Sequence, residues 1–581
     1  MEQTQGEGQQ TSQAPIDAVG SSRVVVESNV AVPMRDGVVL RADVYTPEGP
    51  GPWPVLLSRT PYGRATADHL NFLEPVHAAQ KGFIVVNQDT RGRGQSEGEW
   101  MPFRHEYEDG YDSVEWAGRL PRSNGRVGMF GASYFGNAQW MAAAAQPPSL
   151  GAIAPMVTWC DPMNGLYGRG GAVEWGLEVP WTMQMGFEFL LKHPTIAPEA
   201  KMPLVGELLA DLDGLKSGAY WDLPIRRSPT LAKYELPGLG AIRAIDHPET
   251  IAWCRVSGQH DRIEVPSFHG GGWYDVFLQG TLDNYVAMKM AGKDARAVIG
   301  PWTHFVLRDP VGDLCFGAMS SRLGAPVHPH GDTNDFLLAW FRRHLAHDTH
   351  IALPETSVRI FVMGRNVWRD EPAWPLERAR TERHFLNSDG TLTKDRPAEN
   401  SPASTFVYDP ADPVPTHGGP IVMSPGYPAG PIAQAPIEAR DDVLVFTSVP
   451  LEEDVEVTGR IRVVLHASSS APSTDWVARL GDVHPDGRSI NLCDGILRVA
   501  TGADAKGRYE IDLWSTSNVF LAGHCIRVQV TSSCFPRWDR NLNTGDQDSP
   551  AMQIAQQSIF HDPEFPSFIE LPVVPGSPGN P

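Results

Sequence analysis

The stretch that decides the fold is RVGMFGASYFGNAQWMAAAAQ, residues 126–146. It opens with an apolar run typical of a buried strand and continues into a sequence typical of a helix. The tight turn between them carries Ser133, whose hydroxyl is expected to project above the edge of the sheet. The amino end of the helix adds partial positive charge where an oxyanion would form. We therefore predict that Ser133 is a catalytic nucleophile, with a structural serine in a tight turn as the alternative.

A second serine matches the nucleophile pattern G-x-S-x-G more literally. It is Ser96 in GQSEG, residues 94–98, whereas Ser133 has Phe135 where that pattern requires glycine. The strand before Ser96 ends near Asp89, and the following EGEWMPF contains a glycine and a proline, which make a poor helix start. Because the strand–turn–helix context is missing, we predict that Ser96 is a loop residue.

Outward from the quoted stretch, strands alternate with helices, which implies a mainly parallel sheet covered by helices. This alternation spans residues 23–157 and resumes over 242–350. Residues 158–241 are rich in Trp, Met and Leu and show no convincing strand, so we expect a helical insertion there. Many short strands separated by turns predict an all-β sandwich or jelly roll over 351–577. Residues 1–22 are polar and are expected to be a disordered tail.

A nucleophilic serine needs a histidine base and an acid that orients the base. In a strand–helix fold of this kind, the three follow in the order Ser, acid, His. Asp275 comes shortly after the apolar run ending at Phe268, and His304 follows the strand ARAVIG. We predict Asp275 and His304 as the partners of Ser133.

Four other histidines are alternatives to His304. His260 and His269 precede the predicted acid, and His328 and His330 lie in the turn-rich VHPHGD. The HPH pair could also belong to a metal site, but no further ligands lie at suitable spacing. We therefore predict no metal and no cofactor.

Composition argues against several partners. The net charge of −21 is unfavourable for binding nucleic acid or an anionic membrane, which need clustered cations. No apolar run approaches the ~18–20 residues of a membrane span. The six cysteines include no C-x-x-C pair, so we expect buried free thiols rather than a disulfide framework or a zinc site. The amino-terminal stretch is unlike a signal peptide, and we predict a cytoplasmic protein.

Several motifs together resemble the bacterial cocaine esterase family, which is similar to X-Pro dipeptidyl-peptidases and α-amino acid ester hydrolases. They are GRVGMFGASYFG (125–136), QDTRGRGQSEG (88–98), GGWYD (271–275), GPWTH (300–304), YDPADPVPTHGG (408–419), DGRSINLCDGILR (486–498) and NVFLAGH (518–524). The resemblance covers roughly residues 25–575. Family members carry G-x-S-Y-x-G, so Gly136 matches them. The resemblance implies an α/β-hydrolase core, an inserted helical cap and a C-terminal jelly-roll domain.

The resemblance also implies site residues. It implies a triad of Ser133, Asp275 and His304, and an oxyanion hole formed by the Tyr62 hydroxyl and the Tyr134 backbone N–H. It suggests an acyl pocket formed by Trp181, Phe277, Val422 and Met423. For Val422 and Met423, ordinary core packing is the alternative. A structural charge network, or alternatively a solvated loop, is expected at Asp89, Arg91 and Arg93.

Three functions are compatible with these residues. The first is a serine hydrolase that cleaves a carboxylic ester or amide of a small molecule through an acyl-enzyme. The second is an X-Pro dipeptidyl-peptidase or α-amino acid ester hydrolase, which needs carboxylates to pair with a substrate ammonium; the cap offers Glu174, Glu178 and Glu188. The third, a non-catalytic binding protein, is disfavoured by the intact set of Ser, Asp, His and Tyr. The expected partner is a small-molecule ester, and a homodimer is left open.

Overall fold

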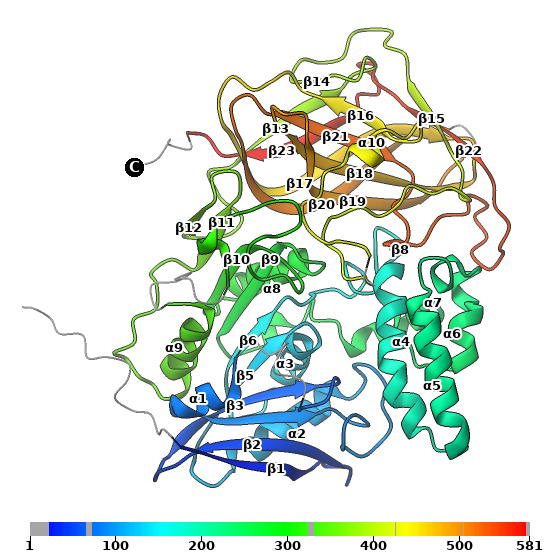
Figure 1. The fold of residues 1–581 in the computed structure, drawn as a ribbon. Helices are drawn as coiled ribbons and strands as arrows, with labels where there is room; N and C mark the ends of the chain where they lie inside the picture. The colour runs from blue at the N-terminus through cyan, green and yellow to red at the C-terminus, as the bar shows by residue number, and fades with distance from the viewer. Residues whose placement is uncertain (1–22, 66–72, 323–330, 424–425, 503–504, 577–581) are drawn as a thin grey trace, which may run out of the picture.

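A ten-stranded mixed sheet organises the first part of the chain, in the order β1-β2-β4-β3-β5-β6-β9-β10-β11-β12 (Figure 1). The strands from β4 to β11 along this order run parallel, and the pairs at both edges are antiparallel. The computed structural model describes residues 23–65, 73–322, 331–423, 426–502 and 505–576. The expected tail at 1–22, together with His328 and His330, therefore lies outside the described residues. The strands are β1 Val24–Pro33, β2 Val39–Pro47, β3 Trp53–Thr60, β4 Ile84–Asp89, β5 Ser123–Ala132, β6 Leu150–Met156, β9 Ser267–Tyr274, β10 Ala295–Thr303, β11 Val358–Val362 and β12 Val367–Glu371.

The strands in the middle of this sheet are buried on both faces, as expected for parallel strands covered by helices. In β4 the side chains of Ile84 and Val86 pack in one apolar cluster, and that of Val85 packs in another. The first cluster includes side chains of α2, α3 and α8, and the second includes side chains of α1 and α9. The helices are α1 Pro75–Gln80, α2 Glu106–Gly118, α3 Tyr134–Ala144, α8 Leu278–Met290 and α9 Thr333–Leu345.

The central sheet extends past the residue where the β domain was expected to begin. β11 pairs in parallel with β10, with Ala297 opposite Val358, and β12 pairs with β11. Both strands were expected in the β domain because they are short and separated by turns. A short run of strand-forming residues indicates where a strand lies in the sequence. It does not indicate which sheet the strand joins, because strand pairing is a long-range contact. Strand pairing therefore crosses the expected boundary at residue 351.

A helical cap lies between β6 and β9, and its apolar side chains share one cluster with Tyr134 and Phe277 of the sheet part and Phe535 of the β domain. It stands beside the sheet and below the β domain in Figure 1. Helical turns continue past residue 241 as far as Arg262, so the sheet resumes later than expected. The segment also contains a two-stranded hairpin of very short strands, β7 and β8, which the sequence did not indicate. Its elements are β7 Gly168–Arg169, β8 Ala172–Val173, α4 Trp175–Lys192, α5 Pro198–Asp213, α6 Pro229–Tyr234 and α7 Ala241–Asp246.

Where the structure describes it, the C-terminal part is all-β apart from the short helix α10, with a seven-stranded and a four-stranded sheet. The larger sheet has the order β14-β13-β23-β17-β22-β15 with β20 on β17, and the smaller has the order β16-β21-β18-β19. This matches the expected β-sandwich class. The elements are β13 Arg380–Leu386, β14 Leu392–Thr393, β15 Ser404–Tyr408, α10 Ala435–Glu438, β16 Leu444–Thr447, β17 Val455–Ser469, β18 Ser473–Val483, β19 Ser489–Ala500, β20 Gly507–Phe520, β21 Cys525–Thr531, β22 Ala555–Ile559 and β23 Phe568–Val573.

The β domain contacts the start of α4, the first helix of the cap, through hydrogen bonds and close packing. Gly176 N donates to the Arg537 carbonyl at 2.9 Å, and Trp538 Nε1 donates to Glu174 Oε1 at 2.7 Å. Gly176 has no side chain, and a Cβ there would lie 2.9 Å from the end of the Met423 side chain. This close approach fixes α4 against the β domain.

The structure can be compared with the expectations for the cysteines and for membrane-spanning segments. All six cysteines are free; four are buried, Cys525 is half-buried, and Cys315 is exposed rather than buried as expected. None of the helices in the described ranges is both long and apolar enough to cross a membrane.

Candidate active site

Ser133 sits on a strained turn between β5 and α3. Its backbone has φ 59° and ψ −121°, a left-handed conformation that is costly for a residue with a side chain. The Ser133 N–H donates to the Met156 carbonyl at 2.9 Å, which ties the turn to β6. The Ser133 hydroxyl makes no capping bond to α3. The turn thus presents this hydroxyl to the pocket instead of using it for the helix.

The glycines around Ser133 explain the displaced pattern. At Gly131, φ is +127° and an added Cβ would lie 2.6 Å from Phe135 Cβ. At Gly136, an added Cβ would lie 2.9 Å from Thr158 Cβ and 3.1 Å from the Met156 carbonyl oxygen. The crowded position after the serine is therefore 136, where the neighbouring strand passes. Phe135 has room for a side chain, and its ring packs 5.7 Å from the ring of Tyr62.

His304 and Asp275 form a hydrogen-bonded pair at the ends of adjacent strands. Asp275 follows β9 and His304 follows β10. His304 Nδ1 lies 2.7 Å from Asp275 Oδ2, and the other carboxylate oxygen accepts the Phe277 N–H at 2.7 Å. The Asp275 side chain is 0% exposed. A buried carboxylate in this position holds the imidazole in one orientation with Nε2 available.

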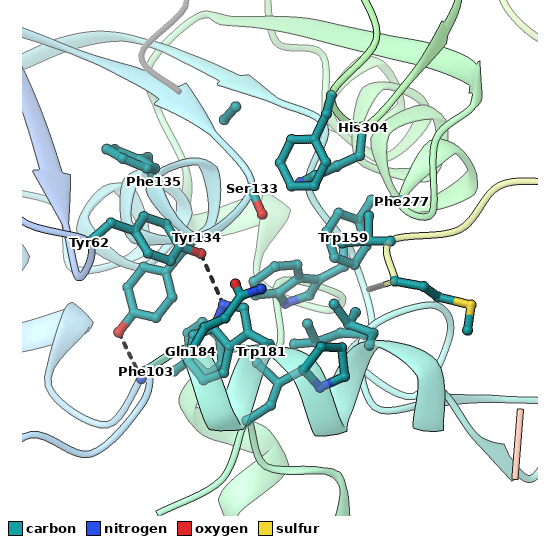
Figure 2. Close-up of a pocket in the computed structure, with 18 of the residues that line it drawn as sticks. Tyr62, Phe103, Ser133, Tyr134, Phe135, Trp159, Trp181, Gln184, Phe277 and His304 are labelled. Atoms are coloured by element: carbon teal, nitrogen blue, oxygen red, sulfur yellow. Dashed lines mark hydrogen bonds between the residues drawn. The ribbon is translucent and has the colours of Figure 1, made fainter. Parts of the chain in front are cut away.

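Ser133 and His304 line one cavity of about 350 Å³ (Figure 2). Their side chains make no direct hydrogen bond in the described structure. Such bonds are often long without substrate and tighten in the reacting complex. The alternative histidines lie elsewhere: His260 bonds to Asn284 Oδ1 at 2.9 Å, and His269 bonds to Ser267 Oγ at 2.9 Å.

Two donors lie beside Ser133. The Tyr62 hydroxyl accepts a hydrogen bond from Trp181 Nε1 at 3.1 Å (Figure 2), and it interacts with the Ser133 side chain. Burial raises the pKa of Tyr62 to about 12, so its hydroxyl stays protonated and can donate. The Tyr134 N–H lies in the first turn of α3, where helix N–H groups lack partners within the helix. The Tyr134 hydroxyl is used for anchoring, because it donates to Glu106 Oε1 at 2.9 Å.

The cavity wall comes from all three parts of the chain. The four expected pocket positions line it, and two of them, Val422 and Met423, come from the segment after β15. Sequence reasoning missed three residues of α4, Leu177, Pro180 and Gln184, which line the cavity with Trp181. Their spacing of three, four and seven residues is the signature of one helix face and was available in the sequence. Other lining residues that sequence reasoning missed are Phe103, Trp159, Leu166, Leu239, Phe305 and Leu307.

The cavity wall has no charged side chain other than the titratable His304 among the residues that the structure describes. The three cap carboxylates that might have bound a substrate ammonium have other partners. Glu174 accepts from Trp538 Nε1, and Glu188 pairs with Arg93 Nη2 at 2.8 Å. Glu178 accepts backbone N–H groups at the start of α7, including that of Ala241 at 3.0 Å. None of the three lines the cavity.

The loop after β4 is a buried charge network. Arg91 Nη2 pairs with Asp109 at 2.6 Å, and the carboxylate of Asp89 pairs with Arg64. Arg93 Nε donates to the Pro61 carbonyl at 2.7 Å, directly before Tyr62 in the sequence. The three expected residues are therefore structural, and Arg93 helps to fix the turn that carries the Tyr62 hydroxyl.

One group of potential metal ligands occurs among the described residues, in the β domain. It comprises Asp482, His484 and His524, whose ligand atoms lie within 4.8 Å of one another. Asp482 already bonds to His524 Nδ1 at 2.8 Å, which accounts for this pair without an ion.

Comparison with known proteins gives two family matches. Residues 36–306 match the model of the X-Pro dipeptidyl-peptidase (S15 family), and residues 352–570 match that of the X-Pro dipeptidyl-peptidase C-terminal non-catalytic domain. The second match includes β11 and β12, so the family boundary precedes two strands that complete the central sheet.

Individual relatives agree with these matches. The chain is 39% identical to the cocaine esterase of Rhodococcus sp. (strain MB1 Bresler), over 94% of this chain and 98% of the relative. Among solved structures, an aminopeptidase from a marine sediment Thaumarchaeota archaeon is 24% identical with a TM-score of 0.76, and the match covers 98% of this chain and 99% of that one. An α-amino acid ester hydrolase is 24% identical with a TM-score of 0.75, covering 98% and 100%. The chain belongs to the cocaine esterase family of hydrolases.

Proposed function

We propose that the chain is a serine carboxylesterase in which Ser133 is the nucleophile, His304 the general base and acid, and Asp275 the residue that orients His304. One observation carries this proposal: Ser133, on its strained turn, lines the same cavity as His304, whose Nδ1 lies 2.7 Å from Asp275 Oδ2. A strained elbow of this kind exposes the serine oxygen above the sheet edge. Asp275 and His304 come from the ends of two neighbouring strands, as the order Ser, acid, His requires.

The residues divide the reaction between them. Ser133 Oγ attacks the carbonyl carbon of the ester while His304 takes its proton. Negative charge develops on the carbonyl oxygen, where the Tyr62 hydroxyl and the Tyr134 N–H are the proposed donors. His304 then gives the proton to the departing alcohol, which leaves an acyl group on Ser133. A water molecule, deprotonated by His304, then attacks the acyl group. The carboxylic acid is released, and Ser133 regains its proton from His304.

The cavity supports a substrate with a bulky, uncharged acyl group. Aromatic and aliphatic side chains dominate its wall, including Trp159, Trp181 and Phe277. A charged substrate group would lose its hydration there without gaining a countercharge, which is unfavourable. This argument also opposes the second candidate, an enzyme that reads a free α-ammonium, because the cap carboxylates are engaged elsewhere.

A matched pair of substrates tests the proposal. Methyl 3-phenylpropionate and the methyl ester of phenylalanine differ only in the α-ammonium. We expect a higher kcat/KM for the uncharged ester, and turnover of p-nitrophenyl butyrate that Ser133→Ala abolishes. A preference for phenylalanine methyl ester, with release of p-nitroaniline from Ala-Pro-p-nitroanilide, would instead favour the peptidase or amino acid ester hydrolase.

A further inference from the structure

Almost every polar side chain in the cavity wall already has a partner. Trp181 Nε1 donates to the Tyr62 hydroxyl at 3.1 Å, and the Trp159 Nε1 donates to the Cys254 carbonyl at 2.9 Å. The Tyr134 hydroxyl is held by Glu106, and His304 Nδ1 by Asp275. Apart from the reacting groups of the proposed triad, this leaves one polar side chain to explain among the lining residues that the structure describes.

That side chain is Gln184 in helix α4. It lies on the same helix face as Leu177, Pro180 and Trp181, at the position where an apolar stripe would be expected to continue. Figure 2 shows its amide directed into the space between Tyr62 and Trp159. Gln184 is exposed to the cavity, and no hydrogen bond joins its side chain to any other residue within the described ranges.

We propose that Gln184 is a hydrogen-bonding subsite for one uncharged polar substituent, a hydroxyl, carbonyl or amide group, on an otherwise apolar ester. This inference rests on the proposed esterase function and names its substrate class. A carboxamide both donates and accepts, and it is neutral, so it suits a neutral polar group rather than an ion. A site built to bond such a group discriminates against an analogue that lacks it, because the amide is then left unpaired in the complex.

The test measures coupling between Gln184 and the substituent. The probes are p-nitrophenyl 3-arylpropionates with either a hydroxyl or a methyl group at the meta or para position of the ring, and benzyl acetates with either group at the meta position. The two substituents have similar size, so their kcat/KM ratio reports hydrogen bonding. In Gln184→Met an unbranched side chain of similar length replaces the amide. The matched control is Gln547→Met, because Gln547 is exposed in the β domain away from this cavity.

For at least one substituent position, wild type and Gln547→Met should prefer the hydroxyl ester by about fivefold to tenfold, and Gln184→Met should lose this preference. In Gln184→Glu, whose ionised carboxylate still accepts a hydrogen bond from a hydroxyl, the preference for the hydroxyl ester should survive. An unchanged hydroxyl-to-methyl ratio in Gln184→Met at every position would overturn the subsite. If Ser133→Ala hydrolysed all of these esters at the wild-type rate, the proposed function itself would fail, which separates the two inferences.

Discussion

Two regions of the hydrolase part carry a serine between glycines, and they differ in what the hydroxyl is used for. Ser96 matches the general pattern, yet its Oγ donates to the Asp89 carbonyl at 2.8 Å and accepts the Arg41 N–H at 2.9 Å. Ser133 departs from that pattern, yet its backbone is held at φ 59° with the hydroxyl free of the helix. Ser96 joins the loop after β4 to β2, whereas Ser133 faces the cavity.

The difference shows that the two serines are distinguished by the hydrogen bonds of their hydroxyl groups and not by the spacing of the neighbouring glycines. A buried hydroxyl bonded to two backbone groups stabilises the fold and has no freedom to attack. A hydroxyl on a strained turn, with an imidazole in the same cavity, has the opposite character. A substitution at Ser133 should therefore lower activity with little change in stability, and one at Ser96 should lower stability with little change in activity.

The largest expected effect is on turnover by Ser133→Ala. Removing the nucleophile should lower kcat by about 10⁴–10⁶, measured with p-nitrophenyl butyrate. The melting temperature should change little, because the Ser133 side chain caps no helix. Phenylmethanesulfonyl fluoride should label Ser133 in wild type, as read by peptide mass spectrometry. A label on Ser96 would break the comparison.

The next effect concerns Asp275, the residue proposed to orient His304. Asp275→Asn should leave the fold intact but lower kcat by about 10⁴, because the amide no longer holds His304 in the productive tautomer. Circular dichroism provides the check on folding. Wild-type kcat in a folded Asp275→Asn protein would mean that the 2.7 Å bond to His304 does not serve catalysis.

A smaller effect is expected at the proposed oxyanion donor. Tyr62→Phe removes only the hydroxyl, while the ring can still pack against Phe135. Loss of one such donor typically lowers kcat by about 10²–10³, with KM little changed. The measurement needs an ester whose chemical step limits turnover. An unchanged kcat on that ester would remove Tyr62 from the oxyanion hole.

These regions also show how far the sequence leads. The strand–turn–helix context of Ser133 and the chain order of Asp275 and His304 are local or sequential features, so they could be predicted. The pairing of β11 with β10 could not, because strand partners are chosen by long-range contacts. The same holds for Glu178, whose partners are backbone N–H groups about sixty residues away.

The residues that line the cavity could be predicted only in part from the sequence. The helical spacing that brings Gln184 beside Trp181 is visible in the sequence, but the spacing alone does not tell which face of α4 meets the cavity. Val422 was suggested only by resemblance, because its place depends on how the β domain packs against the cap. Local patterns therefore indicate the proposed reacting groups more directly than the residues that line the cavity.

The crowding at the elbow gives a moderate expected effect on stability. In Gly136→Ala the new Cβ would meet Thr158 at 2.9 Å and Met156 at 3.1 Å, so unfolding should become easier by about 1–3 kcal/mol. Gly206→Ala is the matched control, since Gly206 also lies within a helix but has nothing within 4 Å of an added Cβ. That change should stabilise by about 0.5–1 kcal/mol. Equal effects in urea unfolding would show that position 136 is not crowded.

The smallest expected effect on turnover, and the one that completes the contrast, belongs to Ser96→Ala. The change leaves the Arg41 N–H and the Asp89 carbonyl without their hydroxyl partner in a largely buried site. The expected cost is about 1–2 kcal/mol of unfolding free energy, with kcat within about twofold of wild type. Ser133→Ala should show the reverse, a large loss of turnover at nearly constant stability. If Ser96→Ala instead lost turnover while unfolding at the wild-type urea concentration, the loop after β4 would have a part in the chemistry, and two hydrogen bonds to the backbone would no longer identify a structural serine.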